Sequence, residues 1–296
     1  MGQFFESLPG GVNSVSRRWV KKESVKAQQL FLDYQADLLP HGEAHRYAEF
    51  LVARNFAGYY RGIEPGSFAP EKNPFKQPKS ARPYIFSTDD VANLMQAAGN
   101  LTPTNAIKSQ TFITLIGLLR ATGMRISEAL NLTTDDIYQQ PDRLFIANTK
   151  FGKDRCIPIK ETTAAKLRTY IKIRRQFVTA ARDLPVFINQ RGKVLSYRTA
   201  QEVFSNLLGQ CQIGTDWQGA SPRLHGLRHT FAVNCLIEAY RQGIDPNSRL
   251  PYLVTYLGHR DLAATNVYLH TTPELMELTS QRRHDYFFSR TEADHD

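Results

Sequence analysis

The chain has 296 residues and carries 37 Lys and Arg against 28 Asp and Glu, which gives a formal net charge of +9 and a pI near 9.5. This length predicts two domains, and a hydrophobic content of 42% excludes a chain that is disordered throughout. The positive charge favours a polyanionic partner, because Lys and Arg bind phosphate groups, although many basic proteins bind no nucleic acid.

The cysteines and the apolar runs exclude further classes of protein. Cys156, Cys211 and Cys235 are odd in number and far apart, which argues against a disulfide framework and against a zinc site. No N-terminal segment has the pattern of a secretory signal, and no apolar run approaches the length of a membrane span. We therefore expect a soluble protein of the reducing cytoplasm, with no membrane partner.

The first 64 residues are expected to form a helical N-terminal region. Residues 1–20 have no clear period and are interpreted as a loose arm, whereas 25–60 show helical spacing of apolar residues. Residues 65–83 follow as a Pro-rich basic linker, because proline lacks a backbone donor and disfavours a helix before it. Three lysines of this linker either lie along a DNA backbone or are only solvated: Lys72, Lys76 and Lys79.

Residues 84–296 are expected to form a mainly α-helical domain with one small antiparallel β-sheet. Ser87 begins a helix, and a second helix with Phe112 and Leu119 on its apolar face ends at Gly123. Two segments rich in Ile and Phe flank a Gly-containing turn and predict a β-hairpin. The hairpin strands are predicted at 143–149 and 155–160, and further helices at 161–182, 198–210, 227–242, 248–257 and 273–285.

Four short segments place polar side chains beside these apolar elements. In the first, Glu128 follows Arg125 at a spacing that brings both to one helix face, a pattern equally typical of a surface ion pair. The second is the hairpin turn, which carries Lys150, Lys153 and Arg155. A lysine at the tip of a mobile hairpin can swing into a neighbouring site, but most charged hairpin tips are only solvated.

The third segment places His225 and Arg228 three residues apart, so that a helix directs both at one place. A forked cation beside a group that titrates near neutral pH suits a phosphate undergoing transfer; a core histidine with a surface arginine is the alternative. In the fourth segment Gly258 ends an apolar helix, His259 follows, and Tyr268 comes nine residues later. Any of the 13 tyrosines could be a packing residue, so only its neighbours single out Tyr268.

Taken together, these segments resemble the tyrosine recombinase (phage integrase) family over residues 83–290. The resemblance implies a catalytic domain of that family preceded by a short helical DNA-binding domain. It also implies that DNA is cut and rejoined through a 3′-phosphotyrosyl bond to Tyr268. The residues that carry it occur in the family's order: Arg125, Lys150, His225 and Arg228, Leu257–Gly258–His259, and Tyr268.

The resemblance also implies a role for each residue. Arg125 and Arg228 would bind the non-bridging oxygens of the scissile phosphate, and Lys150 would protonate the leaving 5′ oxygen. His225 would serve in acid–base work, and His259 would hydrogen-bond the phosphate. The other matched positions have supporting roles: Glu128 would order the site, Lys153 is the competitor for Lys150, and Lys153 and Arg155 are candidate DNA contacts.

These roles are physically coherent without a cofactor. Two fixed guanidiniums offset the charge of a phosphodiester and stabilise the further charge of the transition state. A free tyrosine has a pKa of about 10, and nearby cations favour its nucleophilic phenolate. No carboxylate cluster in the sequence suits a metal ion, so we expect neither a metal site nor another cofactor.

The resemblance implies double-stranded DNA as the partner and a homotetramer on that DNA, with or without co-acting recombinases. A helix beginning at Thr272 would dock on a neighbouring subunit or pack on its own domain. The spacing between Arg228 and His259 is similar to that in recombinases of mobile elements, which implies DNA integration, excision and transposition. Two alternatives stay open: a relaxing enzyme like type IB topoisomerases, and a non-catalytic DNA-binding regulator with the same fold.

Overall fold

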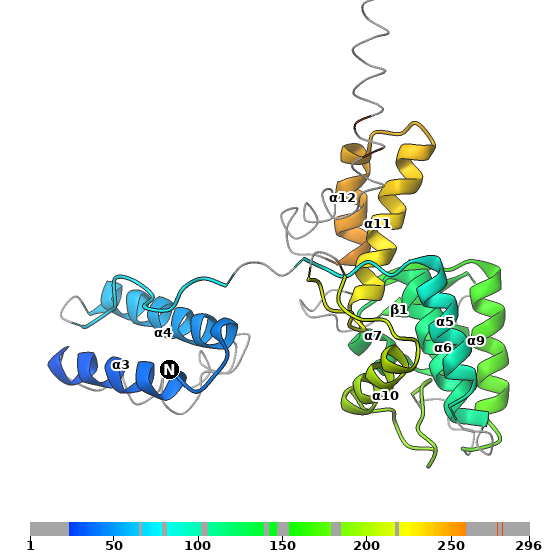
Figure 1. Cartoon of the computed structure of the whole chain (residues 1–296), viewed down its shortest axis with the longest axis horizontal. Helices are drawn as coiled ribbons and strands as arrows, with labels where there is room; N and C mark the ends of the chain where they lie inside the picture. Colours follow the sequence, from blue (N-terminus) through cyan, green and yellow to red (C-terminus); the bar gives the residue numbers. More distant parts are fainter. Residues whose placement is uncertain are drawn as a thin grey trace, which may run out of the picture. The chain divides into compact units, whose positions relative to one another are not determined.

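The computed structural model describes residues 24–64, 67–78, 82–101, 106–138, 142–146, 154–178, 185–216 and 219–258, together with Glu277 and Ser280. The chain separates into two units, residues 1–80 and 81–296, each with its own hydrophobic core. Figure 1 shows the helices of both units. The predicted arm at 1–20 lies outside the described residues, and so does the predicted helix 273–285 apart from Glu277 and Ser280.

The first unit contains helices α3 (Ser24–Leu38) and α4 (Glu43–Ile63), which lie side by side in Figure 1. They confirm the helical spacing of residues 25–60. Phe31 of α3 packs edge-on against Phe50 of α4, with 5.8 Å between ring centroids. Edge-to-face geometry is favourable for aromatic pairs because the positive ring edge meets the negative ring face.

The start of the Pro-rich segment packs on this first unit. The ring of Phe68 lies edge-on to Phe31 at 5.7 Å, and the side-chain amide of Asn73 donates to the carbonyl of Tyr47 at 3.0 Å. Residues 67–78 therefore add to the core of the first unit. The boundary between the units falls after Ser80, inside the stretch predicted as the linker.

The second unit is mainly helical and is built around α6, which packs beside α5, α9 and α11. Leu115 and Ile116 of α6 are fully buried, and each such side chain contributes about 1.5–3 kcal/mol to stability. The predicted helix start at Ser87 is confirmed by a capping box with Asp90. The longer helices are α5 (Thr88–Gly99), α6 (Ala106–Thr122), α9 (Glu161–Arg174), α10 (Tyr197–Gln210), α11 (Gly226–Arg241) and α12 (Pro246–Leu257).

Two further helices and one sheet complete the described part of this unit. The short helix α7 (Ile126–Asn131) begins next to Arg125, where the Arg125–Glu128 spacing indicated a helix start, whereas α8 (Thr134–Tyr138) was not among the predicted elements. Strands β1 (Arg143–Ile146) and β2 (Arg155–Pro158) pair antiparallel, which confirms the predicted hairpin and the mainly α class with a small antiparallel sheet. Their register places Ile146 opposite Arg155 at the end that leads into the turn.

The prediction of a helix through residue 182 is wrong, because α9 ends at Arg174. Beyond it, Gln176 and Phe177 bond to carbonyls three residues back, which tightens the chain into turns. The carbonyl of Phe177 then lies 3.0 Å from where a Cβ on Gly192 would be.

Helices α11 and α12 form a second cluster of buried apolar residues, and they lie side by side in Figure 1. The chain just before α5 is fixed to α11. The backbone N–H of Phe86 donates to Thr230 Oγ1 at 2.9 Å, and Gly226 lets the Phe86 ring approach closely. No helix among the described residues combines the length and apolar character of a membrane span.

Candidate active site

Two helix ends with glycine in the left-handed region frame the candidate site. Gly123, with φ +61°, follows α6, and Gly258, with φ +63°, follows α12. A Cβ at Gly123 would lie 2.4 Å from the Phe231 ring, so both backbone angle and space require glycine there. The last carbonyls of each helix lack helical partners and carry partial negative charge, so they attract cations.

Arg228, in the first turn of α11, bonds to both of these helix ends. Its Nη1 donates to the carbonyl of Gly123 at 2.9 Å, and its Nη2 donates to the carbonyl of Leu257 at 2.6 Å. Only 2% of the residue is exposed. The alternative of a surface arginine at this position is therefore wrong, because the guanidinium is held in the protein interior.

Arg125 reaches the same end of α12 from the start of α7. Its Nη2 donates to the carbonyl of Gly258 at 2.7 Å, and its Nη1 forms an ion pair with Glu128 at 2.9 Å. The other oxygen of Glu128 accepts the backbone N–H of Arg125 at 2.8 Å. The Glu128 side chain is only 7% exposed, so this pair lies inside the site and the surface ion-pair alternative is wrong.

Arg155, the first residue of β2, brings a third guanidinium to the site. Its Nη2 donates to Glu128 at 2.7 Å, and its side chain is 13% exposed. From the sequence, Arg155 was identified only as a candidate DNA contact, and its ion pair with Glu128 was not predicted. Strand alternation was the available signal, because Arg155 shares a strand face with the fully buried Ile157 two residues on.

These side chains make an electropositive site. The guanidiniums of Arg125 and Arg155 pair with the carboxylate of Glu128, and the guanidinium of Arg228 binds the carbonyl next in the chain to the one that Arg125 binds. Among the described residues these three cations meet one carboxylate, so the local charge is positive and suits an anion. In the same part of the chain there is no group of three or more His, Cys, Asp and Glu placed to hold a metal ion. The arrangement can bind a phosphate and stabilise charge that develops on it.

His225 stands directly before α11, at the edge of this group. The residue is exposed, so the alternative of a core histidine is wrong. Its ring is nevertheless partly desolvated, which lowers the pKa of His225, and the charges of Arg228 and Arg125 lower that pKa further. The imidazole is therefore kept neutral near pH 7 and is able to accept a proton.

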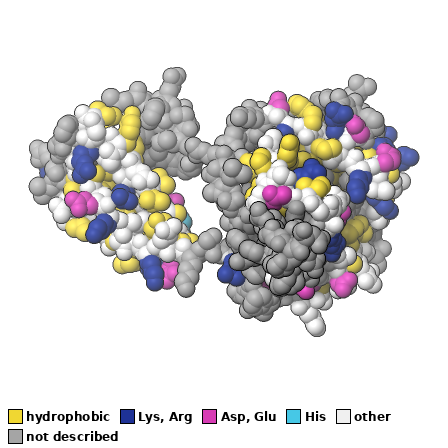
Figure 2. Space-filling view, turned by 90° about the horizontal axis from the view of Figure 1, so that it is seen from above, with side chains coloured by type: hydrophobic (Ala, Val, Ile, Leu, Met, Phe, Trp, Pro, Cys, Tyr) yellow, Lys and Arg dark blue, Asp and Glu magenta, His cyan; other side chains and the backbone are white. Residues whose placement is uncertain are grey.

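Several predicted residues lie outside the described part of the chain. Lys150 and Lys153 belong to the hairpin turn between Ile146 and Arg155, and Lys79 belongs to the linker. His259 and Tyr268 belong to the stretch that follows Gly258. Arg155, close to the end of the hairpin turn, and Gly258, directly before His259, both lie at the site. Lys72 and Lys76 are exposed on the first unit, and Figure 2 shows Lys and Arg side chains on both units.

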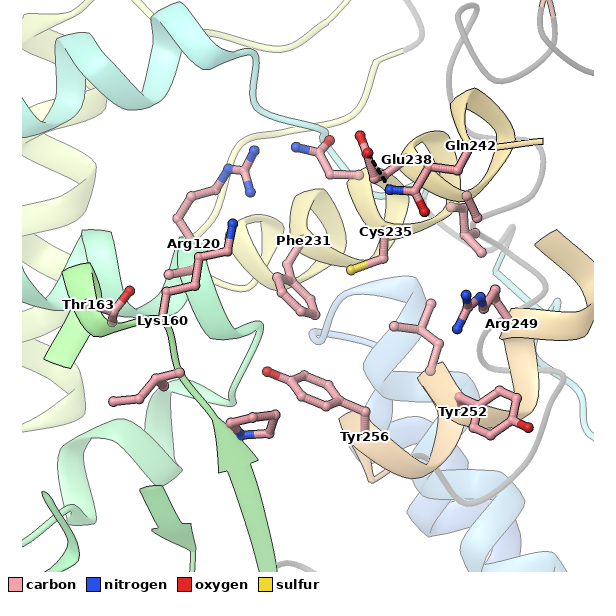
Figure 3. Close-up of a pocket in the computed structure, with 17 residues that line it drawn as sticks. Arg120, Lys160, Thr163, Phe231, Cys235, Glu238, Gln242, Arg249, Tyr252 and Tyr256 are labelled. Carbon is pink, nitrogen blue, oxygen red and sulfur yellow. Dashed lines mark hydrogen bonds between the residues drawn. The ribbon is translucent and has the colours of Figure 1, made fainter. Parts of the chain in front are cut away.

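Tyr256, on the last turn of α12, is a tyrosine close to the site arginines. Figure 3 shows it beside Phe231, and the two rings stack with 5.4 Å between their centroids. Both rings line a hollow of about 780 Å³ whose other walls come from α6, α9, α11, α12 and the end of β2. Burial raises the pKa of Tyr256 and nearby Cys235 raises it further, while Arg155 and Arg228 act in the opposite direction. A phenol in this position stays neutral and packed, which makes it a poor nucleophile.

Comparison with known sequences gives a consistent family match. The model of the phage integrase family matches residues 85–274. A candidate integrase/recombinase of Sinorhizobium fredii, y4rB, is 37% identical over 254 residues, covering 84% of this chain and 81% of the relative. The tyrosine recombinase XerC of Bacillus subtilis is 30% identical over 238 residues, covering 74% of this chain and 69% of the relative.

Comparison with solved structures shows the same fold at low identity. The XerH site-specific recombinase, bound to its difH substrate after cleavage, superposes with a TM-score of 0.60 and 18% identity. That match covers 94% of this chain and 75% of the other. The Tn1549 transposon integrase in complex with transposon right end DNA gives a TM-score of 0.58 and 17% identity, covering 95% and 90%.

Proposed function

Because the chain belongs to the phage integrase family of tyrosine recombinases, enzymes that break and rejoin DNA, we propose that it is a site-specific recombinase with Tyr268 as nucleophile. It cuts one DNA strand by forming a 3′-phosphotyrosyl bond and then joins that end to another strand. We further propose that the exchange serves integration and excision of a mobile DNA element. A transposon integrase among the similar structures supports this second step.

One observation carries the proposal: two arginines are fixed to the end of the helix that leads into the nucleophile segment. Arg125 binds the carbonyl of Gly258 and Arg228 binds that of Leu257. His259 follows directly, and Tyr268 comes nine residues later. Because both cations are anchored where this segment begins, a phosphate between them is held within a short length of chain from the tyrosine.

The proposed cleavage step removes one proton from the nucleophile and supplies one proton to the leaving group. The Tyr268 oxygen attacks phosphorus, the phosphorus–5′ oxygen bond breaks, and a 3′-phosphotyrosyl bond replaces it. The neutral imidazole of His225 takes the phenol proton, while Lys150 supplies a proton to the leaving 5′ oxygen. Arg125 and Arg228 stabilise the charge of the transition state. In the rejoining step, the 5′ hydroxyl of another strand attacks the phosphotyrosyl phosphorus, a phosphodiester forms and Tyr268 leaves with its proton restored. The covalent bond conserves the energy of the broken phosphodiester, so no nucleoside triphosphate is consumed.

The proposed partner is double-stranded DNA in the cytoplasm, bound by a homotetramer. Basic side chains on both units support a DNA partner, since phosphates are neutralised by Lys and Arg. Exchange between two duplexes requires four strand cuts, and one nucleophile per chain makes a tetramer the smallest assembly that performs them all. Lys72, Lys76, Lys79 and Lys153 are proposed as phosphate contacts.

The experiment uses a nicked DNA substrate from which the cut strand diffuses away, so that the covalent intermediate accumulates. Candidate sites come from the ends of the genetic element that encodes the chain. The full chain is compared with Tyr268→Phe and with the matched control Tyr256→Phe, and products are resolved on a denaturing gel. We expect a slowly migrating protein–DNA adduct with the full chain and with Tyr256→Phe, and none with Tyr268→Phe.

Other outcomes reject the proposal in distinct ways. An adduct that persists in Tyr268→Phe removes that residue as the nucleophile. Tight DNA binding by the full chain without any adduct supports a non-catalytic regulator. Relaxation of supercoiled DNA without preference for any site, by a monomer, supports a topoisomerase-like enzyme.

A further inference from the structure

Arg155 has no part in the proposed chemistry, yet it is built into the site. Its guanidinium is largely buried and donates to Glu128 Oε2 at 2.7 Å. Its Nε and Nη1 atoms are buried without a hydrogen-bond partner in the described structure. Burying a guanidinium in this way costs free energy, and the ion pair with Glu128 offsets that cost only if both partners stay in place.

Glu128 connects this arginine to Arg125. One carboxylate oxygen accepts from the Arg125 guanidinium, and the other accepts both from the Arg125 backbone N–H and from Arg155. Both oxygens of the Glu128 carboxylate therefore already accept hydrogen bonds. A change at Arg155 removes one of the two cations that pair with Glu128, so the Arg125 side chain becomes the remaining cationic partner of this buried carboxylate.

A contact with Gly258 fixes Arg155 from another direction. The Arg155 Nη1 atom lies 2.4 Å from the point where a Cβ on Gly258 would be, and the Arg125 Nη1 atom lies 3.6 Å from the same point. Both guanidiniums thus lie close to the same side of Gly258, one from the hairpin and one from the residue before α7. This arrangement ties the base of the hairpin, the acidic residue and the end of α12 to one another.

We propose that Arg155 is a positioning residue: through Glu128 it holds the Arg125 guanidinium in the orientation in which it binds the scissile phosphate. The inference rests on the proposed function, because it assigns Arg155 a task in that same cleavage reaction. A direct DNA contact is disfavoured for this residue, since its side chain is 13% exposed and is occupied by Glu128.

The test measures the single-turnover rate constant of adduct formation on the nicked substrate. The variants are Arg155→Gln, Arg155→Lys, Glu128→Gln and the double variant Arg155→Gln with Glu128→Gln. The matched control is Arg143→Gln, which removes the same charge from the other strand of the hairpin, where Arg143 pairs with Asp142 at the surface. A rate constant is read rather than an amount of product, so a partly unfolded preparation does not alter the result.

We expect Arg155→Gln to slow adduct formation by about 100-fold, while the Kd for intact DNA stays within about threefold. Arg155→Lys should be similarly slow, because an ammonium cannot replace the planar fork. The double variant should be no slower than Glu128→Gln alone, since Arg155 acts through that carboxylate. Normal rates in Arg155→Gln or Arg155→Lys, or multiplicative effects in the double variant, would overturn the inference.

A second substrate separates positioning of Arg125 from a merely structural role. In a methylphosphonate, one non-bridging oxygen is replaced by a methyl group, so the phosphorus centre is neutral and depends less on Arg125. We expect the defect of Arg155→Gln to shrink at least tenfold on this substrate, in parallel with that of Arg125→Gln. An equal defect on both substrates would mean that Arg155 only supports the fold. Absence of any adduct with the full chain would reject the proposed function, and this inference with it.

Discussion

The guanidinium of Arg228 donates a 2.6 Å hydrogen bond to the carbonyl of Leu257, the last residue of α12. Together with its bond to the carbonyl of Gly123, this means that one side chain satisfies the terminal carbonyls of two helices. Arg228 is therefore part of the core as well as a residue predicted to bind phosphate. Its replacement should affect stability and cleavage together.

We expect Arg228→Lys to lower the free energy of unfolding by about 1–3 kcal/mol, because an ammonium cannot span both carbonyls and one buried acceptor loses its donor. Adduct formation should fall by about 100-fold or more. Denaturant unfolding and the single-turnover rate measure the two effects. Arg223→Lys, at an exposed position just before α11, is the control and should alter neither. Unchanged stability of Arg228→Lys would contradict the structural role.

Two glycines with nearly the same φ angle allow the effect of close packing at Gly258 to be separated from the effect of its backbone conformation. Gly258 has φ +63° and Gly243 has φ +73°, but a Cβ at Gly243 would have no atom within 4 Å. Gly243→Ala should lose about 1 kcal/mol of stability from its backbone alone and keep full cleavage. Gly258→Ala should lose more stability and most cleavage activity, because its methyl group displaces Arg155. Equal behaviour of the two variants in unfolding and cleavage would show that the contact is unimportant.

The lowered pKa of His225 makes stability depend on pH in a defined direction. Desolvation, then Arg228 and Arg125, make the folded protein take up the His225 proton at a lower pH than the unfolded chain. The free energy of unfolding should therefore fall as pH drops below about 6.5, and it should gain nothing from His225 above that pH. In His225→Gln this part of the slope should disappear. Unfolding curves at about pH 7.5 and about pH 5.5 measure it; an identical slope in both proteins would contradict the shift.

Much of the second unit follows from local patterns in the sequence. The apolar stripe around Leu115 predicts α6, the Ser87–Asp90 pair predicts the start of α5, and Gly258 predicts the end of α12; all three are confirmed. These signals depend on neighbours within one or two helical turns. The extent of α7 and the existence of α8 were not predicted, because six and five residues are too few to display a helical period.

Contacts between residues far apart in the chain could not be predicted from local sequence patterns. The burial of Arg228 depends on its hydrogen bonds to the carbonyls of Gly123 and Leu257, which are 105 and 29 residues away in the chain. The pairing of Arg155 with Glu128 likewise joins residues 27 apart. Arg125, Glu128, His225 and Arg228 could be singled out from residue types and order, but their catalytic roles remain predictions, as do those of Lys150, His259 and Tyr268.

The bond between Phe86 and Thr230 has a mechanical consequence. The chain that leaves the first unit enters the second as the segment before α5, and Phe86 is held there by Thr230 and by close packing on Gly226. Gly226 and Thr230 lie in the first turns of α11, on either side of Arg228, and Gly226 directly follows His225. Tension transmitted along the connecting chain is therefore delivered to the first turns of α11, which carry Arg228.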